Sequence, residues 1–111
     1  MVKMYLDTST MTAVLRLDER EFSWEGGREM AEGLLRFIRD SLSEVGAEFS
    51  DISEITFMTG PGSFTGLRIG AAVVNTLATE LGVPLKNHRG ERLEIVVPEY
   101  GRPANISKAK K

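Results

Sequence analysis

The chain has 111 residues, 41% of them apolar and 27% charged, which is the composition of one small globular domain. Its formal net charge of −2 excludes a general electrostatic attraction to nucleic acid or anionic membranes, and no apolar run approaches the ~20 residues that a membrane-spanning helix needs. Cysteine is absent, which excludes disulfides and thiolate chemistry and fits a cytoplasmic protein.

Hydrophobic periodicity predicts a mixed α/β fold. The predicted elements, in chain order, are strands at residues 2–7, 11–17 and 21–24, a helix over 28–45 capped by Gly46, a strand at 54–58, a helix ending near 81, and strands at 84–87 and 93–97. The first seven describe a mixed five-stranded sheet with helices, in the sequence order βββαβαβ. We expect one domain over residues 1–97 and an extended C-terminal tail over 98–111, whose lysines are solvated.

The first predicted helix carries an apolar stripe that is wider than a helix lying on a sheet needs. Two neighbouring rows of apolar residues form it: Met30, Leu34, Phe37 and Leu42, and Ala31, Leu35, Ile38 and Val45. The extra width indicates a surface that a partner covers.

The most informative segment is the glycine-rich run GPGSFTGLRIG from Gly60 to Gly70, which joins an apolar strand to a helix. It matches neither a dinucleotide-binding fingerprint nor a P-loop, so a helix N-terminus that holds phosphate is the less favoured interpretation. We expect Ser63 or Thr65 to cap the helix. Gly66 and Gly70, together with Val73 or Val74, then form a small-residue face that lets another helix approach.

Few residues offer chemistry of their own. Asp7, Thr8 and Ser9 follow the first strand, where actin-like and sugar-kinase folds hold phosphate and metal, and are the candidates for binding a cofactor. Because this loop lacks a glycine, a hydrogen-bonded turn is the favoured interpretation. His88 is the only histidine and is interpreted as a loop residue. We therefore expect no catalytic residue, no metal and no cofactor.

The run from Gly60 to Gly70 resembles the signature of the TsaB/YeaZ family. Further segments resemble other parts of that family, namely Asp7-Thr8-Ser9-Thr10, Leu77-Ala78, Val83-Pro84-Leu85 and Pro98-Glu99-Tyr100-Gly101-Arg102. The resemblance implies an actin-like ATPase (ribonuclease H-like) fold, of which this chain would be the N-terminal lobe. Family members are about twice as long, so we expect most of the second lobe, and half of any nucleotide cleft, to be missing.

The same resemblance implies a non-catalytic scaffold subunit in making N6-threonylcarbamoyladenosine (t6A) in tRNA. Its implied partners are a TsaD-type catalytic subunit or a second copy of the chain, with a TsaE-type ATPase at the junction, tRNA contacted indirectly and no membrane. The expected interface residues on the two helices are Met30, Leu34, Phe37, Ile38, Phe64, Gly66, Leu67, Gly70, Val73, Val74 and Leu77. Gly70→Leu should then abolish association and preserve the fold.

Two other functions stay open at this point. The chain could be a self-associating regulator that competes with a full-length relative for the same partner. It could also be a residual nucleotide-binding or peptidase-like enzyme, which ATP turnover by the purified chain would reveal.

Overall fold

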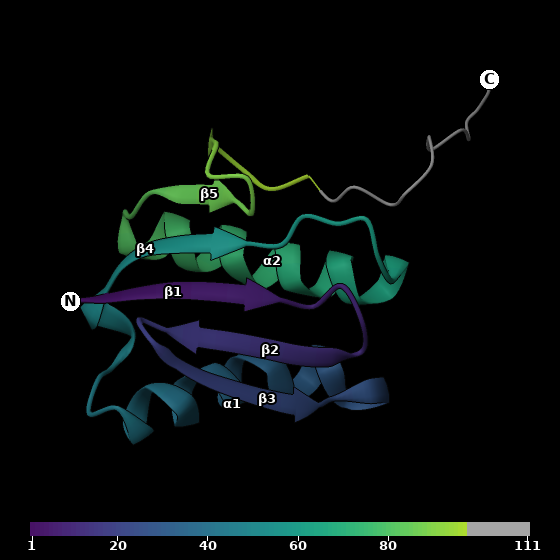
Figure 1. The fold of residues 1–111 in the computed structure, drawn as a ribbon, viewed down its shortest axis with the longest axis horizontal. Helices are drawn as coiled ribbons and strands as arrows, with labels where there is room; N and C mark the ends of the chain where they lie inside the picture. Colours follow the sequence, from purple (N-terminus) through teal and green to yellow (C-terminus); the bar gives the residue numbers. More distant parts are fainter. Residues whose placement is uncertain (98–111) are drawn as a thin grey trace.

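Residues 1–97 are described by the computed structural model, in which a six-stranded sheet packs against two helices (Figure 1). The strands are β1 (Val2–Asp7), β2 (Thr12–Leu17), β3 (Arg20–Glu25), β4 (Ile52–Phe57), β5 (Leu85–Asn87) and β6 (Arg92–Leu93). The helices are α1 (Met30–Glu44) and α2 (Phe64–Leu81), with short 3₁₀ turns η1 (Gly27–Glu29) and η2 (Phe49–Asp51). The predicted tail over 98–111 lies outside the described residues.

The strands lie in the order β3-β2-β1-β4-β5-β6, so the first strand of the chain is in the middle of the sheet. β1 pairs antiparallel with β2, and β2 with β3, so the first three predicted strands form an antiparallel meander. β4 pairs parallel with β1 and with β5, because a helix precedes each of these later strands and carries the chain back. Leu6 of β1 lies opposite Leu15 on one side and Phe57 on the other.

The last strand is shorter than the periodicity predicts. β6 covers only Arg92–Leu93 and pairs antiparallel with β5, whereas a strand was predicted over residues 93–97. The Asn75 side chain on α2 donates from Nδ2 to the carbonyl of Val96 at 3.2 Å and accepts the Val96 N–H at Oδ1 at 2.7 Å. The sheet pairing ends at Leu93, and the backbone of Val96 bonds this α2 amide and is not paired with β5. The predicted five-stranded sheet thus gains β6 as a sixth, two-residue strand.

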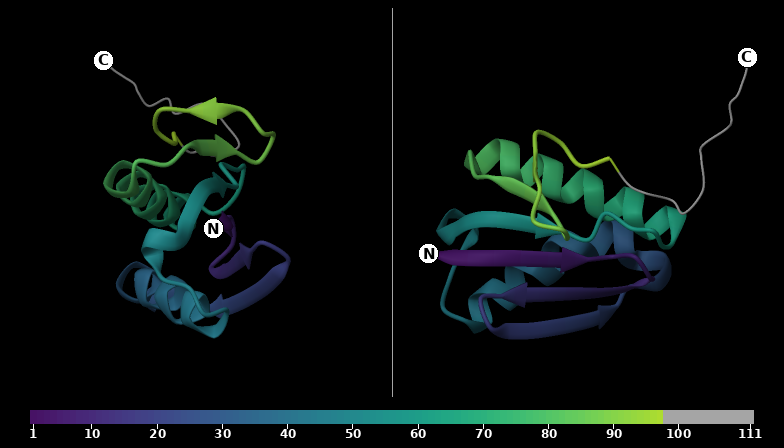
Figure 2. Two further views of the ribbon diagram at one scale, coloured as in Figure 1. Left: turned by 90° about the vertical axis from the view of Figure 1, so that its left-hand side faces the viewer. Right: turned by 45° about the horizontal axis from the view of Figure 1, so that its top comes forward.

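Both helices cover the same face of the sheet (Figure 2). Val2, Met4 and Leu6 of β1 are buried on that face, while Lys3 between them is exposed on the other. The helices close this core with fully buried side chains, among them Leu34, Ile38, Leu67 and Val74. The core therefore lies between one sheet face and the helix layer.

Glycines end both helices as their sequence positions indicate. After α1, Gly46 has a φ of 74°, its N–H donates to the Ser43 carbonyl at 3.0 Å, and the Ala47 N–H donates to the Leu42 carbonyl at 2.9 Å. This confirms the predicted C-cap. Gly82 ends α2 with a φ of 66°. At the other end, α1 begins at Met30 rather than at residue 28, because η1 precedes it.

The uncovered face of the sheet is polar and carries its own charge pairs. Arg16 Nε lies 3.1 Å from a carboxylate oxygen of Glu21, and the Arg16 guanidinium lies 4.7 Å from the ring centroid of Tyr5. Lys86 and Glu54 make a second pair at 3.5 Å on the neighbouring strands. Neither described helix is long and apolar enough to span a bilayer.

Candidate functional site

The glycine-rich turn packs against the loop that follows β1. The Ser63 N–H donates to the Ser9 carbonyl at 2.6 Å, and a Cβ added at Gly62 would lie 2.5 Å from that same oxygen. Gly60 adopts a φ of 115°, in the region that favours glycine. The first glycines of the run thus let two loops meet at the carboxyl ends of β1 and β4.

The later glycines of the run admit atoms of the same chain to the surface of α2. A Cβ at Gly66 would meet the Thr8 carbonyl oxygen, and a Cβ at Gly70 would meet Thr8 Oγ1 and two ring atoms of Phe57, the latter at 2.6 and 2.7 Å. The Thr8 hydroxyl donates to the Gly66 carbonyl at 2.7 Å. The predicted small-residue face for a partner helix was therefore wrong, because the loop after β1 and Phe57 of β4 already occupy it. Gly70→Leu would disturb the fold itself.

Most of the predicted interface residues are buried inside this chain. Eight of the eleven belong to the buried sets of α1 and α2, and these are Met30, Leu34, Ile38, Gly66, Leu67, Gly70, Val74 and Leu77. The remaining three, Phe37, Phe64 and Val73, keep part of their surface open to a partner. Helical periodicity correctly indicates which residues share one side of each helix. In the structure this side packs against the sheet, so it is not available to a partner.

The outer surface of the helix layer carries the predicted Phe64 together with two apolar residues, Leu35 and Ile69, that the interface prediction did not include. Leu35 of α1 is 48% exposed and Phe64 at the start of α2 is 56% exposed, with the Arg68 guanidinium 5.5 Å from the Phe64 ring centroid. Ile69 is half-buried and lines a shallow hollow of about 320 Å³ with Thr65, Arg68 and Ala72. The signal for Leu35 was present in the second apolar row of the first helix.

The side chains of Asp7 and Thr8 and the backbone of Ser9, the candidate cofactor residues, make hydrogen bonds within the chain. The Ser9 N–H donates to Asp7 Oδ1 at 2.8 Å, which is the hydrogen-bonded turn that the loop composition favours. Thr8 is fully buried. At the start of α2, Ser63 Oγ accepts the Gly66 N–H at 3.1 Å, which confirms Ser63 as the N-cap.

His88 follows β5 and lies beside the end of β4. Its Nδ1 is 3.3 Å from the Thr59 N–H nitrogen, and its Nε2 is 3.5 Å from a guanidinium nitrogen of Arg89. Because the Thr59 N–H is a donor, Nδ1 acts as the acceptor in this contact. Among residues 1–97, no group of three or more acidic or histidine side chains is placed to hold a metal ion.

Comparison of the sequence with known proteins gives matches whose descriptions are related to one another. The family described as TsaD, tRNA N6-adenosine threonylcarbamoyltransferase, matches residues 25–87, more than half of the chain. The tRNA threonylcarbamoyladenosine biosynthesis protein TsaB of Escherichia coli (strain K12) is 36% identical over 58 residues, which are 52% of this chain and 25% of that protein. The tRNA N6-adenosine threonylcarbamoyltransferase of Pyrobaculum neutrophilum is 39% identical over 62 residues, 52% of this chain and 18% of that protein.

Solved structures agree with these matches. YeaZ from Pseudomonas aeruginosa superposes with a TM-score of 0.65 at 34% identity, over 78% of this chain and 44% of that one. The matched segments thus span a quarter or less of these curated relatives and under half of the solved chain. The architecture is the actin-like, ribonuclease H-like fold that the glycine signature implied. On the sequence matches and the shared architecture together, the chain belongs to the TsaB/YeaZ family.

Proposed function

We propose that this chain acts in the biosynthesis of t6A in tRNA as a non-catalytic subunit. It pairs through the outer surfaces of α1 and α2 with a TsaD-type catalytic subunit or with a second copy of itself. The names of the TsaB relatives support the pathway. A TsaE-type ATPase joins the pair, the tRNA is contacted through the catalytic subunit, and the complex works in the cytoplasm.

The observation that carries the pairing is the exposed apolar surface of the helix layer. Leu35 and Phe64 are about half exposed, and the half-buried Ile69 and Val73 lie on the same layer. Covering such side chains removes apolar area from water, at roughly 25 cal/mol per Å². The other sheet face offers no comparable gain, because it carries ion pairs such as that of Arg16 and Glu21.

The non-catalytic role is supported by how the polar residues are used. Thr8 holds the carbonyl of Gly66 inside the core, and Asp7 holds the turn after β1. His88 contacts Thr59 and Arg89, and in these contacts it has no carboxylate to orient it as a general base. These groups serve the packing of the glycine turn, and the chemistry is left to the catalytic subunit.

The test is the mass of the 111-residue chain by light scattering, alone and mixed with a TsaD-type subunit from the same organism. We expect a homodimer alone and a one-to-one complex in the mixture. Leu35→Glu should weaken both at least tenfold, since it places a charge in the apolar contact. Ser23→Glu is the matched control, because Ser23 is exposed on β3 and points to the other sheet face. A chain that stays monomeric in both experiments would refute the proposal.

A further inference from the structure

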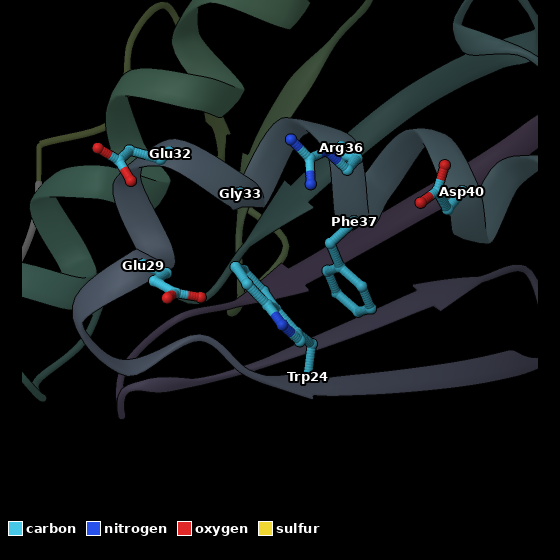
Figure 3. Close-up of a pocket in the computed structure, with 7 residues that line it drawn as sticks. All are labelled: Trp24, Glu29, Glu32, Gly33, Arg36, Phe37 and Asp40. Carbon is cyan, nitrogen blue, oxygen red and sulfur yellow. The ribbon is translucent and has the colours of Figure 1, made fainter.

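A pocket separates α1 from β3, the edge strand of the sheet (Figure 3). It has a volume of about 350 Å³ and is lined by Trp24, Glu29, Glu32, Gly33, Arg36, Phe37 and Asp40. The rings of Trp24 and Phe37 lie side by side below the helix, with their centroids 5.6 Å apart. Neither ring is fully buried, so the pocket has an aromatic floor that solvent reaches.

Gly33 creates the room for this floor. A Cβ at Gly33 would lie 2.6 Å from the far edge of the Trp24 indole, so glycine lets this edge of the ring come close to the helix backbone. The indole Nε1–H makes no hydrogen bond to any residue of the described range. The pocket therefore offers a partly exposed indole ring together with an unused donor.

The rim of the pocket is acidic at one end. Both Glu29 and Glu32 line the pocket, and Figure 3 shows Glu29 beside Trp24 and Glu32 farther along the same end of the helix, with its carboxylate directed away from the ring. Within residues 1–97 neither makes an ion pair. Asp40 lies beyond Phe37 and is already held by Arg39 at 3.1 Å. Among the described residues that line the pocket, Arg36 is the one positive charge against three carboxylates. The charge that would complement the Trp24 end is a cation.

This chain repeatedly places arginine over aromatic rings. Arg16 lies over Tyr5, Arg20 over Phe22 and Arg68 over Phe64, at 4.7 to 5.5 Å from the ring centroids. Tryptophan is the ring that attracts cations most strongly, yet no cation lies over Trp24 among the described residues. A guanidinium suits the site better than an ammonium, because its planar group can stack on the indole and, at the same time, form hydrogen bonds to a carboxylate.

The edge of β3 explains how such a side chain would arrive. Within the described range, β3 pairs only with β2, so its outer backbone groups are open to a further strand. Trp24 is directly opposite Ala13, which is buried on the helix side, so Trp24 points to that side as well. A residue added opposite Trp24 on a new strand would project to the same side, into the pocket.

We propose that β3 and the Trp24 pocket together bind an extended, arginine-bearing segment of a partner protein. The segment pairs with the outer edge of β3, and its arginine stacks on Trp24 and bonds Glu29, while Glu32 adds negative charge at the same end of the pocket. This surface is separate from the outer helix surface proposed above for pairing, so each proposal can fail without the other.

The experiment titrates the full chain with a short acetylated peptide, Thr-Val-Arg-Val-Thr amide, while following Trp24 fluorescence. Trp24 is the only tryptophan of the chain, so the signal reports this site alone. We expect a saturable change with the arginine peptide. The same peptide with citrulline, which keeps the shape and removes the charge, should bind about tenfold more weakly, and a backbone N-methylated version should not bind. Equal binding of arginine and citrulline peptides, or no saturable change, would overturn the proposal.

Variants of the pocket sharpen the test. Glu29→Gln with Glu32→Gln should weaken the arginine peptide about tenfold, since each exposed charge contributes a factor of a few. Arg36→Gln is the matched control, because it lies in the same pocket with the opposite charge, and it should bind the peptide as tightly or more tightly. If both variants weaken binding equally, the pocket acts through its shape alone and the charge argument is wrong.

Discussion

The two helices each contain a glycine that admits another element, and the two sites differ in what surrounds them. At Gly70 the approaching groups are Thr8 and Phe57, which are fully buried, and the contact lies in the core. At Gly33 the approaching group is the half-buried ring of Trp24, at the edge of the sheet. A glycine inside a helix thus indicates close approach, while its neighbours decide whether that approach builds the core or a surface pocket.

The largest expected effect comes from Gly70→Ala. Alanine is the better helix former by about 1 kcal/mol, yet the new methyl group would overlap the Thr8 hydroxyl and the Phe57 ring. Because neither neighbour has room to move, we expect a net destabilisation of about 1–3 kcal/mol in urea unfolding. Ala72→Gly, at an exposed position of the same helix, is the control and should cost about 1 kcal/mol through propensity alone. A Gly70→Ala variant more stable than the parent chain would show that the contact is loose.

Thr8→Val tests the partner of the same contact. Valine keeps the shape of threonine and removes the hydroxyl that donates to the Gly66 carbonyl at 2.7 Å. We expect a loss of about 1 kcal/mol in the free energy of unfolding, the usual contribution of one buried hydrogen bond. Thr10→Val is the comparison, since within residues 1–97 the Thr10 hydroxyl bonds only to Thr12 in its own exposed turn. Equal effects of the two substitutions would mean that the hydrogen bond from Thr8 to α2 contributes no more to the free energy of unfolding than a bond in an exposed turn.

Gly33→Ala should behave differently from Gly70→Ala. The methyl group would collide with the outer atoms of the Trp24 indole, which borders solvent and can swing away. The helix gains about 1 kcal/mol in propensity, so we expect a stability within about 1 kcal/mol of the parent chain. The displaced indole should instead change the fluorescence spectrum of Trp24. A large loss of stability without a spectral change would mean that the edge is as tightly packed as the core.

The smallest effect is expected on the uncovered sheet face, from the pH dependence of Tyr5. Burial raises the pKa of Tyr5 above its ordinary value of 10.0, and the charge of Asp7 raises it further. The unfolded chain then loses the phenolic proton first, so stability is intact below pH 10 and falls as the pH rises from there through the folded-state pKa. Tyr5→Phe should flatten this decline in alkaline urea titrations. An unchanged slope in the variant would assign the decline to other groups.

Much of the fold could be predicted because it depends on local patterns. The alternation of Met4 and Leu6 with polar neighbours marked a strand with one buried face, and Gly46 marked the end of the first helix. The strand predicted over 93–97 was wrong beyond Leu93, and the backbone of Val96 there bonds the side chain of Asn75, a residue 21 positions away. No local pattern contains that contact.

The candidate surfaces were harder to predict than the fold. Spacing placed Gly66 and Gly70 on one side of α2, but it did not show that the loop at Thr8 would lie against them. The same limit hid the pocket, since nothing near Gly33 in the sequence indicates that Trp24 lies over it. Helical periodicity shows on which side of a helix a residue lies, whereas only the tertiary structure shows which residues pack against it.

The central place of β1 has a consequence for how the chain folds. One edge of β1 pairs with β2, which follows within a few residues. The other edge of β1 pairs with β4, which is about fifty residues later in the chain. Local pairings form quickly and distant ones slowly, so the meander of β1, β2 and β3 can form while the second edge of β1 is still bare. During synthesis, before β4 has emerged from the ribosome, β1 is therefore an apolar strand whose backbone groups are unpaired along one edge. During this interval the protein is most prone to aggregate, and a chaperone would then have the largest unpaired, apolar surface to bind.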